Sequence, residues 1–168
     1  RAMPIPGVPV SDEQLFPAVN LALVGWCLLA LAPSWRHTQA VVLTLCALAG
    51  ALYAVTLGSA VASGAVPQGA GFDSLEGVVR LFSSRAVVFS GWVHYTCCDL
   101  LSGLYIVRDA QVHGIPHLIV AVFVLPLTLV AAPVGVLIYL AIKLLWPSGS
   151  AAAAAADNNK KNLEAKSK

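Results

Sequence analysis

Two side chains that can move a proton, His94 and Asp99, stand in an otherwise apolar stretch of the chain. From Ala86 to Val107, Asp99 is the only charged residue. With a helical rise of about 1.5 Å per residue the stretch is about 33 Å long, roughly one hydrocarbon core, so we predict a membrane-spanning helix. A charged side chain in hydrocarbon costs about 3 kcal/mol even on the gentler insertion scales. Asp99 therefore requires a partner, a proton or a functional role.

His94 is the nearest candidate partner in the sequence. The two residues are five positions apart, so they border the same side of a helix without stacking as an i,i+4 pair would. A bound molecule could lie between them and exchange protons with both, His94 and Asp99 acting as a general acid/base pair. The alternative is that both side chains only make hydrogen bonds between helices.

The predicted helix has two chemically different sides. Its polar and small residues fall within an arc of about 140°, and aliphatic residues fill the opposite side. We expect the first side, the polar arc, to face protein and the second, the aliphatic arc, to face lipid. The polar arc contains Gly91, His94, Tyr95, Cys98, Asp99, Ser102, Tyr105 and Ile106; the aliphatic arc contains Val93, Thr96, Cys97, Leu100, Leu101, Leu104 and Val107.

The composition is that of a membrane protein. Of the 168 residues 58% are hydrophobic and only 11% are charged. The net charge is +2 and the basic residues gather near the end of the chain without interleaved aromatic residues, so nothing indicates nucleic-acid binding. The cysteines show no CxxC spacing and all fall in predicted spans, which argues against a disulfide framework and a zinc site. They are Cys27, Cys46, Cys97 and Cys98.

We predict an all-α fold, an integral membrane four-helix bundle occupying residues 15–146. Proline or polar residues separate apolar segments long enough to cross a bilayer. An extended N-terminal arm (1–14) precedes the bundle, and a disordered polar tail of low complexity (147–168) follows it. The expected spans are about 15–31, 39–62, 86–107 and 117–145, with a short interfacial amphipathic helix at 73–84.

Two features of these spans concern packing. Gly50, Ala54 and Gly58 recur every four residues and predict a close contact between helices. Pro126 and Pro133 lie inside the last span, where they should kink it.

Other kinds of site have less support. His113 and His117 have the i,i+4 spacing of a helical metal pair, but Gly114 and Pro116 break that geometry. His94 and His117 lie at different depths in the predicted bundle, so they would not hold a haem between them. The chain has neither a Gly-x-Ser-x-Gly turn nor a glycine-rich phosphate loop.

Several short motifs in the sequence resemble those of the abscisic acid-deficient 4-like membrane proteins. The resemblance covers about residues 15–145, and its most specific part is the Trp-x-His-x4-Asp-Leu core at 92–100. The sequence departs from the family pattern at Leu104, where a basic residue is frequent, and at Tyr139, which is histidine in plant members. The shared motifs are Phe16-xxx-Asn20-Leu21, Ala32-Pro33-Ser34-Trp35, Gly91-Trp92-Val93-His94, Asp99-Leu100, Asp109-Ala110, Gly114-Ile115-Pro116-His117 and Pro133-Val134-Gly135.

The resemblance implies a function in xanthophyll metabolism. Plant members are linked to neoxanthin synthesis in the chloroplast, which implies isomerisation of violaxanthin: opening one 5,6-epoxide and losing a proton from C7 gives an allene. His94 and Asp99 would be the catalytic acid and base. The expected substrate-binding residues are Asn20, Trp92, Tyr95, Tyr105 and Tyr139, and Arg108, Asp109 and His117 would support the site.

The competing interpretation is a non-catalytic, pigment-binding or accessory subunit of a photosynthetic or other plastid membrane complex, in which His94 could ligate a chlorophyll magnesium. We expect no metal site and no cofactor beyond a bound carotenoid or chlorophyll. The expected surroundings are lipid in a chloroplast membrane, either thylakoid or inner envelope. With four spans both termini lie on one side together with most basic residues, so we place them in the stroma.

Overall fold

The computed structural model describes residues 10–146. Helices account for most of this part of the chain and no β-strand occurs in it, which confirms the all-α prediction. The predicted tail and most of the predicted N-terminal arm lie outside the described residues. The helices are α1 (Asp12–Val19), α2 (Ala22–Leu31), α3 (Thr38–Ala62), α4 (Leu75–Leu81), α5 (Arg85–Val112), α6 (His117–Ile119), the π-helical turn η1 (Val120–Val124), α7 (Leu125–Val130) and α8 (Ala132–Leu145).

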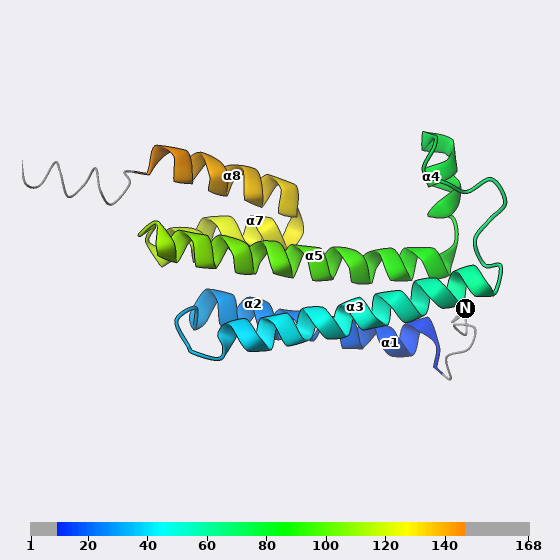
Figure 1. The fold of residues 1–168 in the computed structure, drawn as a ribbon, viewed down its shortest axis with the longest axis horizontal. Coiled ribbons are helices and arrows are strands. Elements are labelled where there is room, and N and C mark those ends of the chain that lie inside the picture. The colour runs from blue at the N-terminus through cyan, green and yellow to red at the C-terminus, as the bar shows by residue number, and fades with distance from the viewer. Residues whose placement is uncertain (1–9, 147–168) are drawn as a thin grey trace, which may run out of the picture. The chain divides into compact units, whose positions relative to one another are not determined.

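The chain divides into two compact units, residues 1–101 and residues 102–168. The N-terminal unit contains α1 to α4 and the first part of α5, and the C-terminal unit contains the rest of α5 with α6 to α8. The long helix α5, at the centre of Figure 1, thus contributes to both.

Helix α1 begins at Asp12, inside the segment predicted to be an extended arm. Ser11 and Gln14 form a capping box, in which each side chain accepts a hydrogen bond from the backbone N–H of the other residue. The first predicted span is then interrupted at Asn20 and Leu21. The N–H groups of Asn20 and Leu21 bond to carbonyls three residues back instead of four, which tightens the chain into a turn between α1 and α2.

Helix α3 packs through a different face from the predicted one. Its buried residues are Thr38, Val42, Cys46, Thr56 and Ala60. A Cβ added at Gly50 or Gly58 would meet no atom within 4 Å, so the predicted small-residue contact is absent from the described part of the chain. Val42 and Cys46 on the buried face remove more apolar surface from water than glycines would, which favours that face.

The aliphatic arc of α5 forms the core of the N-terminal unit. Val93 and Leu100 are each 1% exposed, and Val93 packs with Phe89 and Val19 against side chains of α1 and α3. In contrast His94 and Tyr95, on the polar arc, are exposed. The prediction that the polar arc faces protein is therefore wrong for this unit. The aliphatic side chains interlock with the apolar faces of α1 to α3, and this packing outweighs the few hydrogen bonds that the polar arc could gain.

Helix α4 is shorter than the predicted interfacial helix at 73–84. Ser74 caps it by accepting a hydrogen bond from the Gly77 N–H at 3.1 Å, and Arg80 pairs with Glu76 at 3.1 Å on its surface. Leu75 is exposed, so α4 presents apolar side chains outward as an interfacial helix would.

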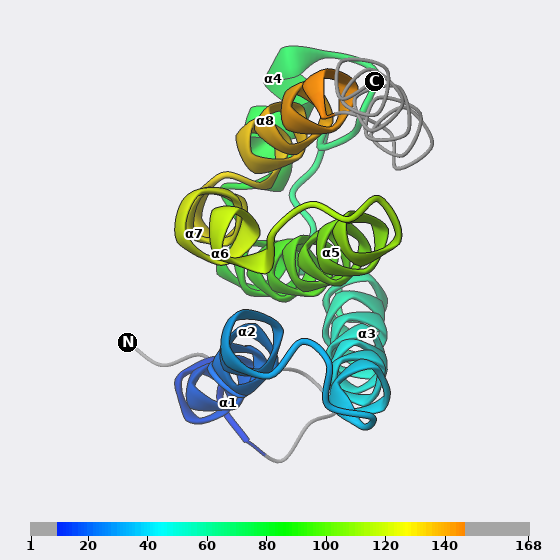
Figure 2. The ribbon, with the colours of Figure 1, turned by 90° about the vertical axis from the view of Figure 1, so that its left-hand side faces the viewer.

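The C-terminal unit contains a helical hairpin where the sequence analysis expected one kinked helix. The chain leaves helical geometry at Ala131 and turns back, so that α7 and α8 lie side by side (Figures 1 and 2). Pro133 explains the break, because it has no N–H for the carbonyl of Leu129 and its ring would clash with that carbonyl. Pro126 lies in the first turn of α7, where proline is tolerated.

Two helical segments are long and apolar enough to cross a membrane, 12–31 and 38–62. Helix α5 has the length, 28 residues, but it is not among them because its polar residues lower its hydropathy. The two arms of the hairpin, 117–130 and 132–145, are apolar but shorter.

Candidate functional site

The two residues expected to be catalytic lie on the same half of α5. His94 is exposed and Asp99 is half-buried. No hydrogen bond or ion pair joins them in the described part of the chain, although the two groups are close enough to interact electrostatically. Neither side chain is fully buried, so a bound molecule can contact both.

Aromatic rings surround His94. The ring of Tyr53, from α3, lies 5.3 Å from the imidazole between ring centroids, and Tyr95 lies 6.2 Å away with its edge toward it. The Sγ atom of Cys98 is 3.7 Å from Nε2 of His94. These contacts hold the imidazole at the surface of the N-terminal unit. Tyr53 was not among the predicted site residues, because nothing in its spacing on α3 distinguishes it from a core residue.

The predicted substrate-binding residues do not all come together. Trp92 stacks on Phe16 of α1 with ring centroids 6.4 Å apart, close to His94 in the sequence. Asn20 is exposed in the turn between α1 and α2. Tyr105 and Tyr139 belong to the C-terminal unit, where their rings meet edge to face at 6.4 Å.

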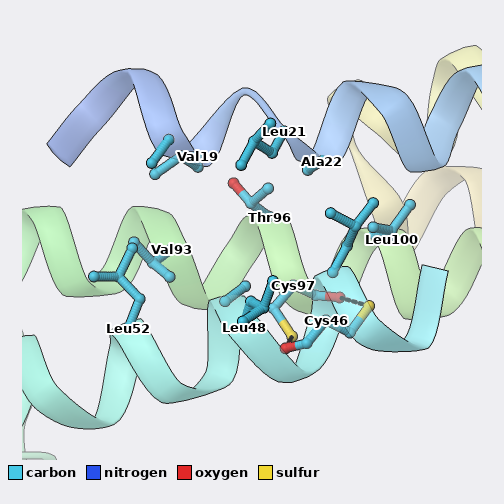
Figure 3. Close-up of a pocket in the computed structure, with 13 residues that line it drawn as sticks. Val19, Leu21, Ala22, Cys46, Leu48, Leu52, Val93, Thr96, Cys97 and Leu100 are labelled. Atoms are coloured by element: carbon cyan, nitrogen blue, oxygen red, sulfur yellow. Dashed lines mark hydrogen bonds between the residues drawn. The ribbon is translucent and has the colours of Figure 1, made fainter. Parts of the chain in front are cut away.

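An apolar cavity of about 170 Å³ lies inside the N-terminal unit. Residues of the turn between α1 and α2, of α3 and of α5 surround it, among them Leu21, Leu48 and Thr96 (Figure 3). A cavity of this size accommodates a small apolar group. It is smaller than ordinary ligand sites, which measure roughly 300–1,000 Å³.

The wall of this cavity includes two neighbouring thiols. The Sγ atom of Cys97 lies 3.4 Å from the carbonyl oxygen of Cys46, and the Sγ atom of Cys46 lies 3.9 Å from the carbonyl oxygen of Cys97. These reciprocal contacts join α3 to α5 (Figure 3). Each thiol contacts the backbone carbonyl of the other cysteine, so neither presents a strongly polar group to the cavity.

An open groove of about 310 Å³ separates the first turns of α1 and α5. At one end Arg85 forms ion pairs with Asp12 and, at 3.0 Å, with Glu13. Asp12 is buried and Glu13 is exposed. The remaining wall is apolar and consists of Phe16, Val88, Phe89 and Trp92. Of these residues only Trp92 was predicted to be in the site; the ion pairs link positions more than 70 residues apart, which no local pattern shows.

The C-terminal unit contains a second polar cluster, centred on Asp109. Its carboxylate accepts hydrogen bonds from the hydroxyl of Tyr139, which is fully buried, and from Lys143 at 2.7 Å. Nδ1 of His113 lies 3.6 Å from the other carboxylate oxygen. Burial raises the pKa of Asp109, but the hydrogen bonds from Lys143 and Tyr139 outweigh it and hold the pKa below its usual value.

This cluster has the geometry of a clamp between α5 and α8. Asp109 was predicted to support the site, whereas His113 was considered only as half of a metal pair and Lys143 was not predicted. Lys143 is the only charged residue between His117 and Trp146, a signal that could have found it. Of the other residues expected to support the site, Arg108 contacts Gln111 at 3.4 Å, and His117 begins α6. No group of three His, Cys, Asp or Glu side chains suited to a metal ion gathers within residues 10–146.

Comparison with known proteins identifies the family. The sequence model of the ABA DEFICIENT 4-like family matches residues 14–139. No curated protein and no solved structure matches the chain. The family match covers more than half of the 168 residues and includes His94, Asp99 and Asp109. The chain belongs to the ABA DEFICIENT 4-like family.

Proposed function

We propose that this protein is a membrane-bound xanthophyll isomerase that converts a 5,6-epoxide end group into an allene, in the manner of neoxanthin synthesis from violaxanthin. The observation that carries the proposal is the membership of the family together with a histidine and a carboxylate that are not paired with each other. The apolar helices at 12–31 and 38–62 support a membrane location.

The reaction is an isomerisation and requires only an acid and a base. A base removes the proton from C7, and the electron pair of that C–H bond forms the new double bond between C6 and C7. The bond between C6 and the epoxide oxygen breaks, and an acid protonates the oxygen, which remains on C5 as a hydroxyl. Atoms and electrons balance without an oxidant or reductant.

His94 and Asp99 can supply the two proton transfers. A protonated Asp99 would donate to the epoxide oxygen while His94 accepts the C7 proton, or the roles would be reversed. The two residues are separated by about 7.5 Å along the helix axis and by about 140° around it, so a ring that contacts both groups would lie across the polar arc. The exposed rings of Trp92 and Tyr95 would pack along the polyene, because aromatic side chains offer large apolar surfaces.

The exposed polar arc of α5 is compatible with this proposal. Uncovered polar groups facing lipid are costly, so a bound pigment that covers the arc would stabilise it. We therefore propose that substrate binds against the outer side of α5 and not inside a bundle. No cofactor other than the carotenoid itself is proposed.

We further propose that the protein spans a chloroplast membrane several times, with the N-terminus in the stroma. The four-span bundle with both termini stromal needs one revision. In the C-terminal unit Lys143, near the end of α8, pairs with Asp109, near the end of α5. The hairpin adds one reversal of direction, so the end of α8 would lie on the side of the membrane where α5 ends.

The test is to reconstitute purified protein in vesicles with violaxanthin and to analyse the pigments. An allenic isomer, formed in proportion to protein and time, supports the proposal. Pigment that stays bound without conversion, together with co-purification of a pigment–protein complex, would instead favour the accessory subunit.

A further inference from the structure

A stripe of three residues runs along one side of α5. Arg85, Trp92 and Asp99 are spaced seven positions apart, and residues at this spacing drift by only about 20° per step around a helix. The distance from Arg85 to Asp99 along the helix axis is about 21 Å. The stripe therefore begins at the open groove and ends at the proposed catalytic carboxylate.

At the charged end of the groove, one carboxylate oxygen of Glu13 can accept a hydrogen bond from a ligand. The side chain of Asp12 is buried; it pairs with Arg85 and accepts a hydrogen bond from the N–H of Glu13 at 2.8 Å. Glu13 uses one oxygen for Arg85, and its second oxygen accepts no hydrogen bond within the described residues. Since Glu13 is exposed, that oxygen can accept a hydrogen bond from a ligand.

The charge of this end selects among ligands. Two carboxylates surround a single guanidinium, so the group carries a net negative charge. A phosphate or another anionic head group is repelled, whereas a neutral hydroxyl group donates a hydrogen bond to Glu13. The stacked rings of Phe16 and Trp92 and the side chains of Val88 and Phe89 form an apolar wall beside it, suited to a ring with methyl substituents.

We propose that this groove binds the hydroxylated ring at the far, non-reacting end of the xanthophyll. The polyene then lies along the stripe past Trp92, and the reacting ring lies at Asp99. This inference rests on the proposed function and deepens it: the long substrate is positioned by a polar anchor at one end, which fixes how far its epoxide reaches along α5.

Binding of two pigments to wild-type and variant protein tests the anchor. The probes are violaxanthin and the same pigment with both hydroxyl groups methylated, and the measurement is quenching of tryptophan fluorescence in detergent. In a Glu13→Gln variant the single side-chain oxygen remains with Arg85 and the group left over is an NH₂ donor. Violaxanthin should bind this variant about tenfold more weakly or worse.

The methylated pigment should bind wild-type protein with a similar loss of affinity. Its affinity should be the same for Glu13→Gln as for wild type, because methylation and the substitution remove the same hydrogen bond. Glu76→Gln, which changes an exposed carboxylate outside the groove, is the matched control and should bind like wild type. Trp92→Leu should weaken both pigments equally. Circular dichroism checks that each variant is folded.

Equal affinities of wild type and Glu13→Gln for violaxanthin would overturn the inference. So would displacement of the pigment by phosphatidylglycerol, since it would assign the groove to a lipid head group. These outcomes are separate from the fate of the proposed function. If binding depends on the hydroxyl groups of violaxanthin but no allenic product forms, the anchor is supported and the isomerase activity is refuted. If Glu13→Gln leaves turnover unaffected, the anchor is refuted and the isomerase activity stands.

Discussion

Gly135→Ala should destabilise the helical hairpin of the C-terminal unit. A Cβ built at Gly135 would lie 2.1 Å from Oγ1 of Thr128 and 2.6 Å from both its Cα and its backbone nitrogen. Rotation of Thr128 could move the hydroxyl, but backbone atoms can move only if α7 shifts away from α8. Thr128 is fully buried and its hydroxyl already bonds to the carbonyl of Val124 at 2.8 Å, so such a shift would disturb other contacts.

The expected size follows from two opposing effects. Overpacking of a tight contact costs typically about 1–3 kcal/mol, and backbone atoms place this site at the upper end. Replacing glycine by alanine in a helix gains about 1 kcal/mol of intrinsic stability. The net loss is therefore about 2 kcal/mol, which in a protein of this size lowers the midpoint of thermal unfolding by about 4–8 °C.

Thermal unfolding in detergent, followed by circular dichroism, measures this shift. Gly50→Ala is the matched control: a Cβ there meets no atom within 4 Å, so the variant should gain about 0.5–1 kcal/mol. Gly25→Ala is a second control, because the nearest atoms, 2.9 and 3.0 Å away, are the ends of the flexible Leu100 side chain. A Gly135→Ala protein as stable as the Gly50→Ala protein would refute the reasoning.

Two further predictions concern stability. Asp109→Asn should lower the midpoint of thermal unfolding at pH 7. Because the folded-state pKa of Asp109 is depressed, the ionised carboxylate stabilises the fold above its unfolded pKa of about 3.9. This stabilisation is lost as pH falls through the folded pKa. The gap between variant and wild type, measured by unfolding as a function of pH, should therefore close below about pH 4, and a gap that persists there would contradict the clamp. Leu100→Ala should cost about 2–5 kcal/mol, because Leu100 is 1% exposed and its loss enlarges the apolar cavity. A cost below that of an exposed replacement outside the cavity, such as Leu23→Ala, would contradict this prediction.

The sequence predicted the elements of the fold better than their contacts. The apolar residues around Asp99 indicate a helix, and Pro33 indicates where a helix ends. Both signals can be read from the sequence because hydropathy and helix breakers act locally. The packing of α5 was predicted the wrong way round, since a periodic pattern shows that two faces differ but not which one the neighbouring helices cover. Only the folded structure shows that the covered face is the one with Val93 and Leu100, which are each 1% exposed.

The candidate site shows the same division. Trp92, His94 and Asp99 stand out in the sequence because polar and aromatic residues are unusual in an apolar helix. The groove depends on Arg85 reaching Glu13, far away in the sequence. The hairpin was missed because two prolines in an apolar run can kink one helix or separate two, and packing of Gly135 against α7 decides between them.

The most direct test of the central claim is the turnover of violaxanthin by wild-type, His94→Ala and Asp99→Asn proteins reconstituted in vesicles. A positioned general acid or base typically raises the rate about 10²–10⁴-fold. Each variant should therefore lose at least about 10²-fold in kcat while still binding the pigment. If wild type forms the allenic product and both variants retain its rate, His94 and Asp99 are not the acid and base of this reaction.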